Sequence, residues 1–381
     1  MKKITEFFKK AFGKTKKAFS ELKNYHVVKR GNISKKKALL IRVGVAVVAL
    51  LFCSLLSVVL IGADPIKFIT SMFDGAFGTP RRLWKLAKDT AILLCIALAI
   101  TPAFKMKFWN IGAEGQTLIG ALASIATAFY LGDKLPNALL LVLMLLAAML
   151  AGAVWAGLPA ICKAKWNTNE TLFTLMMNYI ATGLVLFFLM VWLPNGQTAL
   201  GILPHGHLPV IGHEYLLIII SALVIACLSY VYLRYTKHGY EISVVGESEN
   251  TAKYIGINVG KVVIRTLLIS GAICGIAGFL ITSALDHSIS SETVGGLGFT
   301  AIMVSWLAKF NPLVMLGTSM FIVFLDQGAN QITTVFNIPS AFPDMVFGIV
   351  LFFIIGSEFF ISYSIKRREK KESEKKEKEV S

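Results

Sequence analysis

Hydrophobic residues dominate long, uninterrupted stretches of this 381-residue chain. Lys, Arg, Asp and Glu are absent between residues 42 and 64, 134 and 163, 170 and 214, and 265 and 286. As helices, apolar stretches of about 18 residues or more are long enough to cross the hydrocarbon of a bilayer. Helices of a soluble core would instead show a polar face. The pattern therefore predicts an all-α polytopic membrane protein.

The apolar stretches also predict a topology. We expect about ten crossings, near residues 40–62, 87–104, 110–131, 137–161, 171–193, 215–233, 263–285, 297–308, 312–327 and 344–364. They form a membrane domain over residues 38–365, between a basic tail over 1–37 and a charged tail over 366–381. The outer loops would be residues 64–86, 194–214, 286–296 and 328–343, and the longest inner loop would be 234–262.

The distribution of charge sets the orientation. The chain carries a net charge of +16, and the two tails together hold +14 of it, so the membrane domain is close to neutral. Basic segments that flank apolar spans mark the cytoplasmic side of a membrane. We therefore expect both termini in the cytoplasm, a multi-pass protein of the cell membrane, lipid as the surrounding partner, and no nucleic-acid partner.

Two Gly-rich segments depart from the pattern of simple spans. They are Asn110-Ile-Gly-Ala-Glu-Gly-Gln116 and Gly295-Gly-Leu-Gly-Phe-Thr300, each at the start of a predicted crossing. Short or Gly-interrupted spans in corresponding positions suggest broken helices beside a central pathway, and an internal duplication of five elements per half. Glu114 is ionisable inside a predicted span, so it faces a cavity, a partner or an aqueous path, or else it caps a helix near the interface.

A polar stripe marks the fifth predicted crossing. Glu170, Thr174 and Asn178 are spaced four residues apart and share one face of an otherwise apolar helix. Such a stripe faces the bundle interior, where it either lines a path or forms hydrogen bonds between helices. Asn178 is the better candidate for a path, because Glu170 lies near one end of the span.

The inner loop contains a short helix signal over Gly246–Ile257. Ser248 is a suitable N-cap, Glu249 falls in the first turn, Lys253 lies near the end, and Gly256 provides the stop. A helix of two turns is marginal in water. With Ala252 on its apolar edge, we expect this helix to dock against another protein surface.

These segments resemble one family. The 110–116 segment, Glu170-Thr-Leu-Phe-Thr-Leu-Met-Met-Asn-Tyr-Ile180, the 246–257 loop, Gly271-Ala-Ile-Cys-Gly-Ile-Ala-Gly278, Gly298-Phe-Thr-Ala-Ile302 and Asn311-Pro312 occur in the order seen in permease subunits of ATP-binding-cassette (ABC) importers for nucleosides and simple sugars. That family includes ribose-type and branched-chain amino-acid permeases. The resemblance covers about residues 40–365. The Ala-Glu-Gly-Gln segment and long basic N-terminus look most like the larger of two paired permeases in nucleoside systems.

The resemblance implies a fold similar to the cobalamin-type importers, with about ten helices. It also implies that the 247–256 helix is a coupling helix seated on an ATPase. The coupling residues would be Gly246, Glu247, Ser248, Glu249, Asn250, Ala252, Tyr254 and Gly256. The pair Ser248–Glu249 stands where family members often have Asn-Pro. This departure does not help to choose the substrate.

The chain has no Gly-x-x-x-x-Gly-Lys-Ser/Thr segment, the loop that cradles phosphate in ATPases. We therefore expect no bound cofactor and no enzyme activity in this chain, with ATP and Mg²⁺ held by a partner ATPase subunit. The resemblance further implies a second, homologous permease in a heterodimer and an external substrate-binding lipoprotein. A nucleoside, purine or pyrimidine, is the expected cargo, and a sugar such as ribose is the alternative.

A neutral, polar cargo requires hydrogen-bonding groups along its route. The candidate path residues are Asn110, Glu114, Gln116, Glu170, Thr174, Asn178 and Thr300. An ion-coupled transporter is a different possibility, but it would use several intramembrane carboxylates, and Glu114, Asp326 and Glu358 are few. The sequence contains no motif that is typical of a membrane-embedded enzyme, so that class is disfavoured. The outer histidines, His205, His207 and His213, are interpreted as loop residues, so no metal site is expected.

Overall fold

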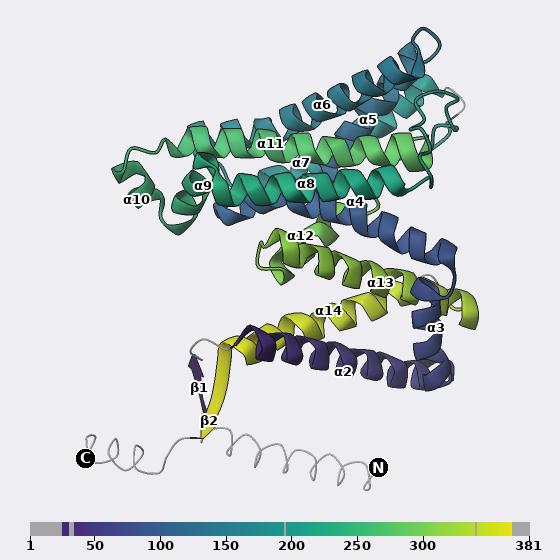
Figure 1. Cartoon of the computed structure of the whole chain (residues 1–381), viewed down its shortest axis with the longest axis vertical. Helices are drawn as coiled ribbons and strands as arrows, with labels where there is room; N and C mark the ends of the chain where they lie inside the picture. Colours follow the sequence, from purple (N-terminus) through teal and green to yellow (C-terminus); the bar gives the residue numbers. More distant parts are fainter. Residues whose placement is uncertain (1–24, 30–33, 194–195, 340, 368–381) are drawn as a thin grey trace, which may run out of the picture. The chain divides into compact units, whose positions relative to one another are not determined.

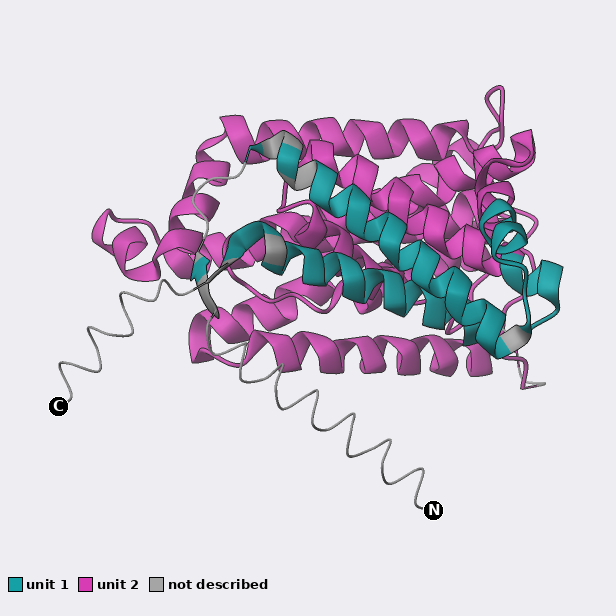
Figure 2. Cartoon of the chain, turned by 90° about the horizontal axis from the view of Figure 1, so that it is seen from below, with its two compact units in different colours: residues 1–71, 332–381 teal, residues 72–331 magenta. Residues whose placement is uncertain are grey.

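The computed structural model describes residues 25–29, 34–193, 196–339 and 341–367. Most of the two predicted tails, residues 1–24 and 368–381, lies outside these ranges. The chain forms two compact units, one of residues Met1–Ser71 with Ile332–Ser381 and the other of Met72–Gln331 (Figure 2). Within these ranges the structure is helical apart from one short strand pair and isolated bridges, which confirms the all-α membrane class.

The first unit is built on two long antiparallel helices, α2 (Lys35–Ile61) and α14 (Ala341–Ser362). Arg42 near the start of α2 forms an ion pair of 2.9 Å with Glu358 near the end of α14. Beside this pair, strands β1 (Tyr25–Lys29) and β2 (Tyr363–Arg367) form an antiparallel ladder. Strands β1 and β2 therefore lie at the same end of the helix pair.

This ladder lies across the predicted boundaries of the membrane domain, which stay a prediction. The predicted N-terminal tail, residues 1–37, contains β1 and the start of α2, and β2 crosses the predicted boundary at residue 365. No local pattern marks this strand pair, because two short charged strands are stable only when each supplies the other's hydrogen bonds.

The second unit surrounds a buried central helix, α4 (Pro80–Lys105), in which every residue from Thr90 to Phe104 is buried. The other elements of this unit, in chain order, are α5 (Ala113–Leu131), α6 (Asn137–Trp166), α7 (Glu170–Trp192), α8 (Leu216–Tyr235), α9 (Lys237–Glu247), α10 (Glu249–Tyr254), α11 (Val259–Ile281) with a π-helical end (Thr282–Asp286), α12 (Leu297–Leu307) and most of α13 (Pro312–Phe336) (Figure 1).

Helix α11 crosses α5 and α6 at very short range because its glycines lack side chains. A Cβ on Gly271 would overlap the carbonyl oxygen of Gly152 on α6, and a Cβ on Gly278 would overlap that of Thr117 on α5. Small residues allow this close packing in membranes, where van der Waals contact replaces the hydrophobic effect between helices. The Gly271–Gly278 segment is therefore a helix-packing motif.

Each of the ten predicted crossings coincides with a helix. Among the described residues, eight helices are long and apolar enough to span a membrane. The two predicted crossings outside this set are α5 and α12, which are the two elements that the sequence distinguished by their polar, Gly-rich starts. Helix α12 has 11 residues, which gives it a length of about 16 Å, roughly half of the hydrocarbon thickness.

The prediction that residues 64–86 form an outer loop is wrong. This segment contains α3 (Pro65–Phe77) and the first turns of α4. Asp64 Oδ1 accepts the Ile66 N–H at 2.8 Å, and Thr79 Oγ1 accepts the Arg82 N–H at 3.3 Å, so both helices begin at capped positions. The charged residues that suggested a loop lie on the helices.

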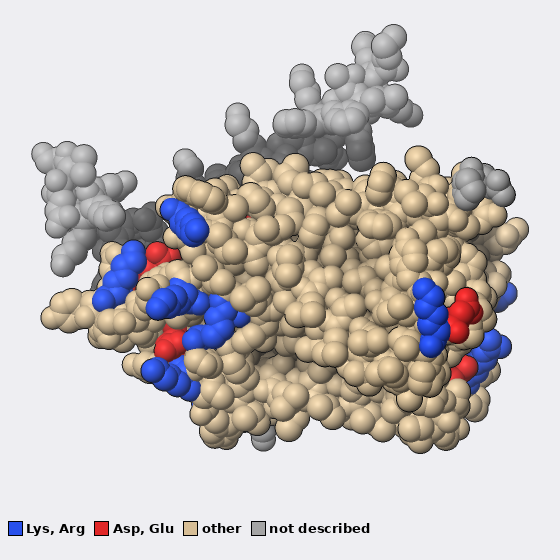
Figure 3. Space-filling view, turned by 90° about the horizontal axis from the view of Figure 1, so that it is seen from above, with Lys and Arg blue, Asp and Glu red and all other residues tan. Residues whose placement is uncertain are grey.

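Charged side chains gather at two ends of the molecule on the face drawn in Figure 3, and a wide area between them shows no Lys, Arg, Asp or Glu. Large apolar residues such as Leu150 and Val154 on α6 and Met190 on α7 are exposed in the structure, at 66%, 61% and 72%. Exposed apolar area of this extent is expected where lipid replaces water.

Candidate functional site

Helices α5 and α12, which have polar, Gly-rich starts, meet at Glu114. Its Oε1 accepts the N–H of Gly296 at 2.8 Å, and its Oε2 accepts the N–H of Gly298 at 2.7 Å. The first N–H groups of a helix have no partner within the helix and carry partial positive charge, so a carboxylate there is stabilising. Glu114 is therefore a cap, as one of the two interpretations proposed, but it caps α12 rather than its own helix.

The glycines of the second segment make this contact possible. A Cβ on Gly298 would overlap the backbone nitrogen of Glu114, and it would lie 2.8 Å from Oε2. Gly296 adopts a φ of +82°, a left-handed conformation that glycine adopts at low cost. The Gly-rich sequence thus allows two polar helix starts to approach each other inside the bundle. We call this contact the α5–α12 junction.

Residues 286–296, the predicted third outer loop, are anchored by two buried side chains, while Asp286, Glu292 and Gly295 are exposed. Ile289 and Val294 are 0% and 1% exposed. The segment after α7 supplies hydrogen bonds to its backbone, including Leu200 N–H to Ile289 O at 2.9 Å. Buried backbone without helical hydrogen bonds needs such partners. The segment is thus held by the loop after α7, and the start of α12 that follows it contacts Glu114.

The polar stripe on α7 holds the start of α5. Thr174 Oγ1 accepts the Ile111 N–H at 3.1 Å, and Asn178 Oδ1 accepts the Gly115 N–H at 2.9 Å. The Asn178 amide also donates to the Ile111 carbonyl oxygen at 2.9 Å. These contacts match the hydrogen-bonding interpretation of the stripe. A role of Asn178 or Thr174 in a substrate path stays a prediction.

The remaining candidate path residues divide into two groups. Asn110 and Gln116 are buried and pair their amides with each other at 3.1 and 3.3 Å. Thr300 lies one turn inside α12, where its hydroxyl donates to the Gly296 carbonyl oxygen. Glu170 lies apart and forms an ion pair of 2.9 Å with Lys163. In this arrangement the junction is closed by its own hydrogen bonds.

The predicted short helix of the inner loop is present as α10. Ser248 Oγ accepts the Thr251 N–H at 3.2 Å, and Glu249 and Lys253 lie in the first and last turns. Gly256 has a φ of +83° after the last turn. The assignment of Gly246 and Glu247 to this helix is wrong, because they form the end of α9, and Ser248 breaks the chain direction between the two helices.

Helix α9 was missed by the sequence analysis, although it has a recognisable signal. Thr236 caps it by accepting the Gly239 N–H at 3.1 Å, and Ile242 and Val245 follow at helical spacing and are buried. Glu241 ties it to α11 through Arg265 at 2.8 Å. The Arg265 hydrogen bond lowers the pKa of the Glu241 carboxyl below its ordinary value.

The segment of α9 and α10, which we call the α9–α10 segment, is anchored on one side and exposed on the other. A Cβ on Gly246 would overlap the carbonyl oxygen of Lys105, so the end of α9 lies directly on the end of α4. Ala252 is fully buried, whereas Tyr254 and Ile255 are 92% and 50% exposed. This geometry presents large side chains to a partner from a fixed base.

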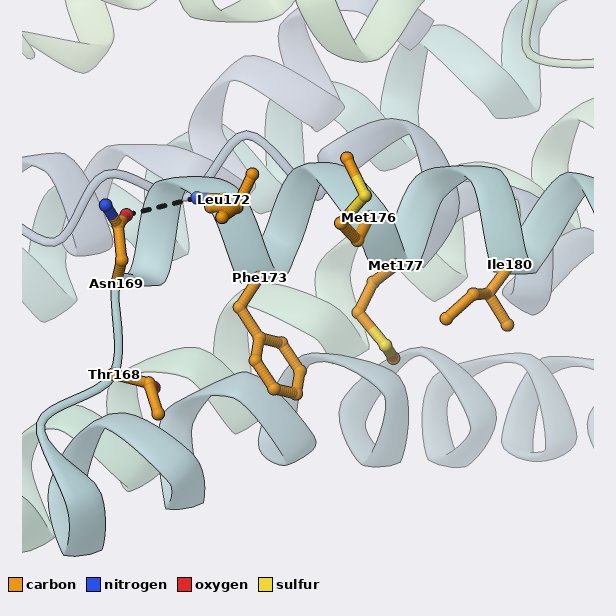
Figure 4. Close-up of a pocket in the computed structure, with 7 residues that line it drawn as sticks. All are labelled: Thr168, Asn169, Leu172, Phe173, Met176, Met177 and Ile180. Carbon is orange, nitrogen blue, oxygen red and sulfur yellow. Dashed lines mark hydrogen bonds between the residues drawn. The ribbon is translucent and has the colours of Figure 1, made fainter.

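A cavity of about 380 Å³ lies on another face of α7 (Figure 4). Its lining is almost entirely apolar, and the Asn169 oxygen is used as the N-cap of α7, where it accepts the Leu172 N–H at 3.1 Å. A nucleoside or sugar needs several converging polar groups. This cavity therefore suits a lipid chain or an apolar protein surface better than a polar cargo.

The three outer histidines have contacts of their own. His205 contacts Asp133 at 2.9 Å, His213 stacks on Trp84, and His207 stacks on His287 with 3.8 Å between ring centroids. Among the described residues, no group of three or more His, Cys, Asp or Glu side chains could hold a metal ion.

In the described part of the chain, eight helices are long and apolar enough to span a membrane, and two short polar helix starts meet inside the bundle. These features define a multi-pass membrane protein of the kind found among transporters. The family model for the branched-chain amino acid transport system / permease component matches residues 82–355. The chain belongs to this family of ABC permeases. It is a transport subunit rather than an enzyme.

Curated relatives agree with this assignment. Glucose ABC transporter permease protein TsgB13 of Haloferax volcanii is 29% identical over 81% of this chain and 85% of its own length. Guanosine ABC transporter permease protein NupP of Bacillus subtilis is 27% identical over 76% and 85%. Guanosine ABC transporter permease protein NupQ, also of Bacillus subtilis, is 30% identical over 56% and 71%.

Proposed function

We propose that this chain is the membrane-spanning subunit through which an ABC importer moves nucleosides into the cytoplasm. The observation that carries the nucleoside assignment is the similarity to NupP, which covers 76% of this chain. A bundle interior that offers amide and hydroxyl groups, with Glu114 held by backbone N–H groups, supports a neutral polar cargo rather than an ion.

The α9–α10 segment is the proposed contact with a partner ATPase, which would hold ATP and Mg²⁺. Gly246 anchors the segment on α4, and Tyr254 and Ile255 are exposed at its tip. A rigid base with a protruding tip can transmit a rigid-body displacement of the partner into the bundle. In this proposal both termini and the α9–α10 segment lie on the cytoplasmic side.

The existence of NupP and NupQ as two guanosine permeases of one organism supports a second, homologous permease as partner of this chain. An external substrate-binding protein would dock on the side opposite to the α9–α10 segment, where the loop after α7 lies in Figure 1. The α5–α12 junction would then be a gate that must loosen when cargo passes.

A simple sugar is the second candidate cargo, because TsgB13 is named as a glucose permease. A cellular uptake experiment separates the two. Cells in which the gene for this chain is deleted would be compared with cells that carry a restored copy, using radiolabelled guanosine, cytidine, ribose and glucose.

We expect nucleoside uptake to depend on the chain and sugar uptake to be unchanged by the deletion. Loss of ribose or glucose uptake alone would replace the nucleoside proposal with the sugar one. Uptake that persists after the nucleotide site of the partner ATPase is inactivated would contradict the proposed source of energy.

A further inference from the structure

A groove of about 210 Å³ lies between three long helices, α4, α8 and α13. Its lining is apolar except for Thr90, and it includes Ala87 and Leu94 of α4, Leu223 of α8 and Leu316 of α13. The side chains of Leu223 and Leu316 are exposed, so the groove opens at the surface of the second unit. We call it the α4–α8–α13 groove. The proposed function does not use it.

Polar and aromatic contacts at the charged end of α4 hold the three helices in place. The Gln327 amide of α13 donates to Asp89 Oδ2 of α4 at 2.9 Å. The Trp84 ring of α4 stacks on His213, three residues before the start of α8, with 3.9 Å between ring centroids. The groove is therefore a fixed feature of the fold.

The hydroxyl of Thr90, the polar member of this lining, has no hydrogen-bond partner among the described residues, although Thr90 is only 8% exposed. In membrane helices such a hydroxyl often donates to the carbonyl four residues earlier, as Thr101 does to Ala97 at 2.8 Å. The hydroxyls of Thr117 and Ser270 also lack a partner, but these residues are completely buried between helices. Thr90 thus combines an unpaired donor with an open apolar groove.

The position of Thr90 along α4 indicates which acceptor can reach its hydroxyl. Five charged residues occur between positions 81 and 89, and the next charged residue is Lys105. Thr90 therefore lies where α4 passes from the polar interface into the hydrocarbon. The ester groups of phospholipids lie at this boundary, and their carbonyl oxygens accept hydrogen bonds.

The size and chemistry of the groove argue against the cargo as its ligand. The groove is smaller than the sites of about 300–1,000 Å³ that enclose small molecules, and a nucleoside needs several converging polar groups. Thr90 offers one. An acyl chain needs only apolar walls, and the ester at its head needs a single donor.

We propose that the α4–α8–α13 groove binds an ester-linked phospholipid. The Thr90 hydroxyl donates to an ester carbonyl oxygen, and the acyl chain attached to that ester lies against Leu94 and Leu316. This assignment does not depend on the cargo, on the lipid headgroup or on the partner ATPase.

The test uses the full-length chain purified in a neutral detergent together with the subunits that remain bound to it. Dissociation constants are measured by native mass spectrometry with dioleoyl phosphatidylcholine and with its diether analogue, which has the same headgroup and chain length but no ester carbonyls. Thr90→Val removes the hydroxyl and keeps the branched shape. Thr318→Val is the matched control, because the Thr318 hydroxyl donates within its own helix, to the Met315 carbonyl oxygen at 3.1 Å.

We expect the unaltered chain and Thr318→Val to bind the ester lipid about threefold to fivefold more tightly than the diether lipid, as one hydrogen bond provides. In Thr90→Val the two lipids should bind equally, with the affinity of the diether lipid. Absence of an ester preference in the unaltered chain would overturn the proposal, and so would a preference that persists in Thr90→Val.

The melting temperature without added lipid guards against a merely structural role of Thr90. Because its hydroxyl has no partner within the protein, Thr90→Val should melt at or above the temperature of the unaltered chain. A clearly lower melting temperature would show that the hydroxyl is bonded inside the protein, and it would overturn the assignment.

A groove-filling variant tests the location of the lipid. Ala87 lies one turn from Thr90 on the same face of α4, so Ala87→Leu fills the space beside the hydroxyl. It should weaken the binding of both lipids alike. Unchanged binding of both lipids, together with loss of a copurifying permease, would assign the groove to a protein partner; unchanged binding alone already overturns the lipid assignment.

Discussion

Replacing Gly246 by alanine tests the base of the α9–α10 segment with a single methyl group. The new Cβ would overlap the carbonyl oxygen of Lys105 and would lie 3.1 Å from both the Lys105 carbonyl carbon and the Met106 Cα. All of these are backbone atoms, so no side chain can rotate away. The end of α9 must therefore separate from the end of α4.

Overpacking of this kind costs about 1–3 kcal/mol. Alanine recovers at most about 1 kcal/mol through its higher helix propensity. The net loss of up to roughly 2 kcal/mol should lower the melting temperature of the purified chain by up to about 3 °C, because the unfolding entropy of a 381-residue chain is large. Transport should fall further than stability indicates, because the displacement occurs where the segment rests on the bundle.

Gly260→Ala is the matched control. A Cβ there would lie 3.4 Å from the Ala164 Cβ and 3.6 Å from Asn258 Oδ1, which are ordinary contacts. This variant should keep or raise the melting temperature and keep uptake of radiolabelled nucleoside. If Gly246→Ala matches Gly260→Ala in both measurements, the end of α9 is not seated on α4 as described.

Three further predictions concern the rest of the molecule. Glu114→Gln leaves an amide that cannot accept both N–H groups of α12, so we expect the free energy of unfolding to fall by about 1.5–3 kcal/mol and uptake to slow. The melting temperature and the uptake rate check this, and unchanged values would remove the cap from the mechanism. Asn178→Leu leaves the backbone at the start of α5 unpaired and should destabilise the chain by about 1–3 kcal/mol; a melting temperature equal to that of the unaltered chain would show that these hydrogen bonds contribute little. Burial, and secondarily the charge of His207, lower the pKa of His287 below its ordinary value of 6.5. The neutral ring therefore stabilises the fold above pH 6.5, and this stabilisation is lost as the pH falls through the lowered pKa. Melting temperatures at pH 7.5 and pH 5 should differ less in His287→Gln than in the unaltered chain, and an equal difference would contradict this.

Much of the helical architecture could be predicted from the sequence because lipid imposes a simple rule. A backbone in hydrocarbon must satisfy its own hydrogen bonds, so an apolar stretch such as residues 137–161 has one available structure. Helix α10 was also predictable, since the cap at Ser248 and the stop at Gly256 are local signals. The distinct character of α5 and α12 followed from their polar starts.

The α5–α12 junction was harder to predict from the sequence. The sequence identified Glu114 and the Gly295–Thr300 segment separately, but their contact joins residues 182 and 184 positions apart, and no local pattern encodes it. The anchoring of His287 and Ile289 depends likewise on backbone hydrogen bonds from the segment after α7. Long-range pairing of this type depends on tertiary structure and not on periodicity.

Helices α3 and α9 were missed for a different reason. Both lie outside the long apolar stretches, and a reading based on hydropathy assigns such residues to loops. Their signals are caps, at Asp64 and Thr236, followed by amphipathic spacing. Capping and periodicity carry more information than mean hydropathy for helices that lie at the ends of a membrane bundle.

The contacts inside the second unit connect the proposed ATPase contact with the proposed gate. Gly246 lies on the end of α4. At the midpoint of α4's buried stretch, the Ala97 carbonyl oxygen accepts the Ser305 hydroxyl of α12 at 3.0 Å. Helix α12 in turn begins on Glu114. In the proposed mechanism, a displacement of α9 would reach the junction through one buried helix that is packed along its length and cannot bend freely. Because α12 is short and starts on a hydrogen-bonded carboxylate rather than on a continuous helix, a small movement of α4 can change the junction without unfolding any span. This arrangement explains why a transporter would keep a costly carboxylate inside its bundle: Glu114 gives the short helix a defined resting position from which it can be released.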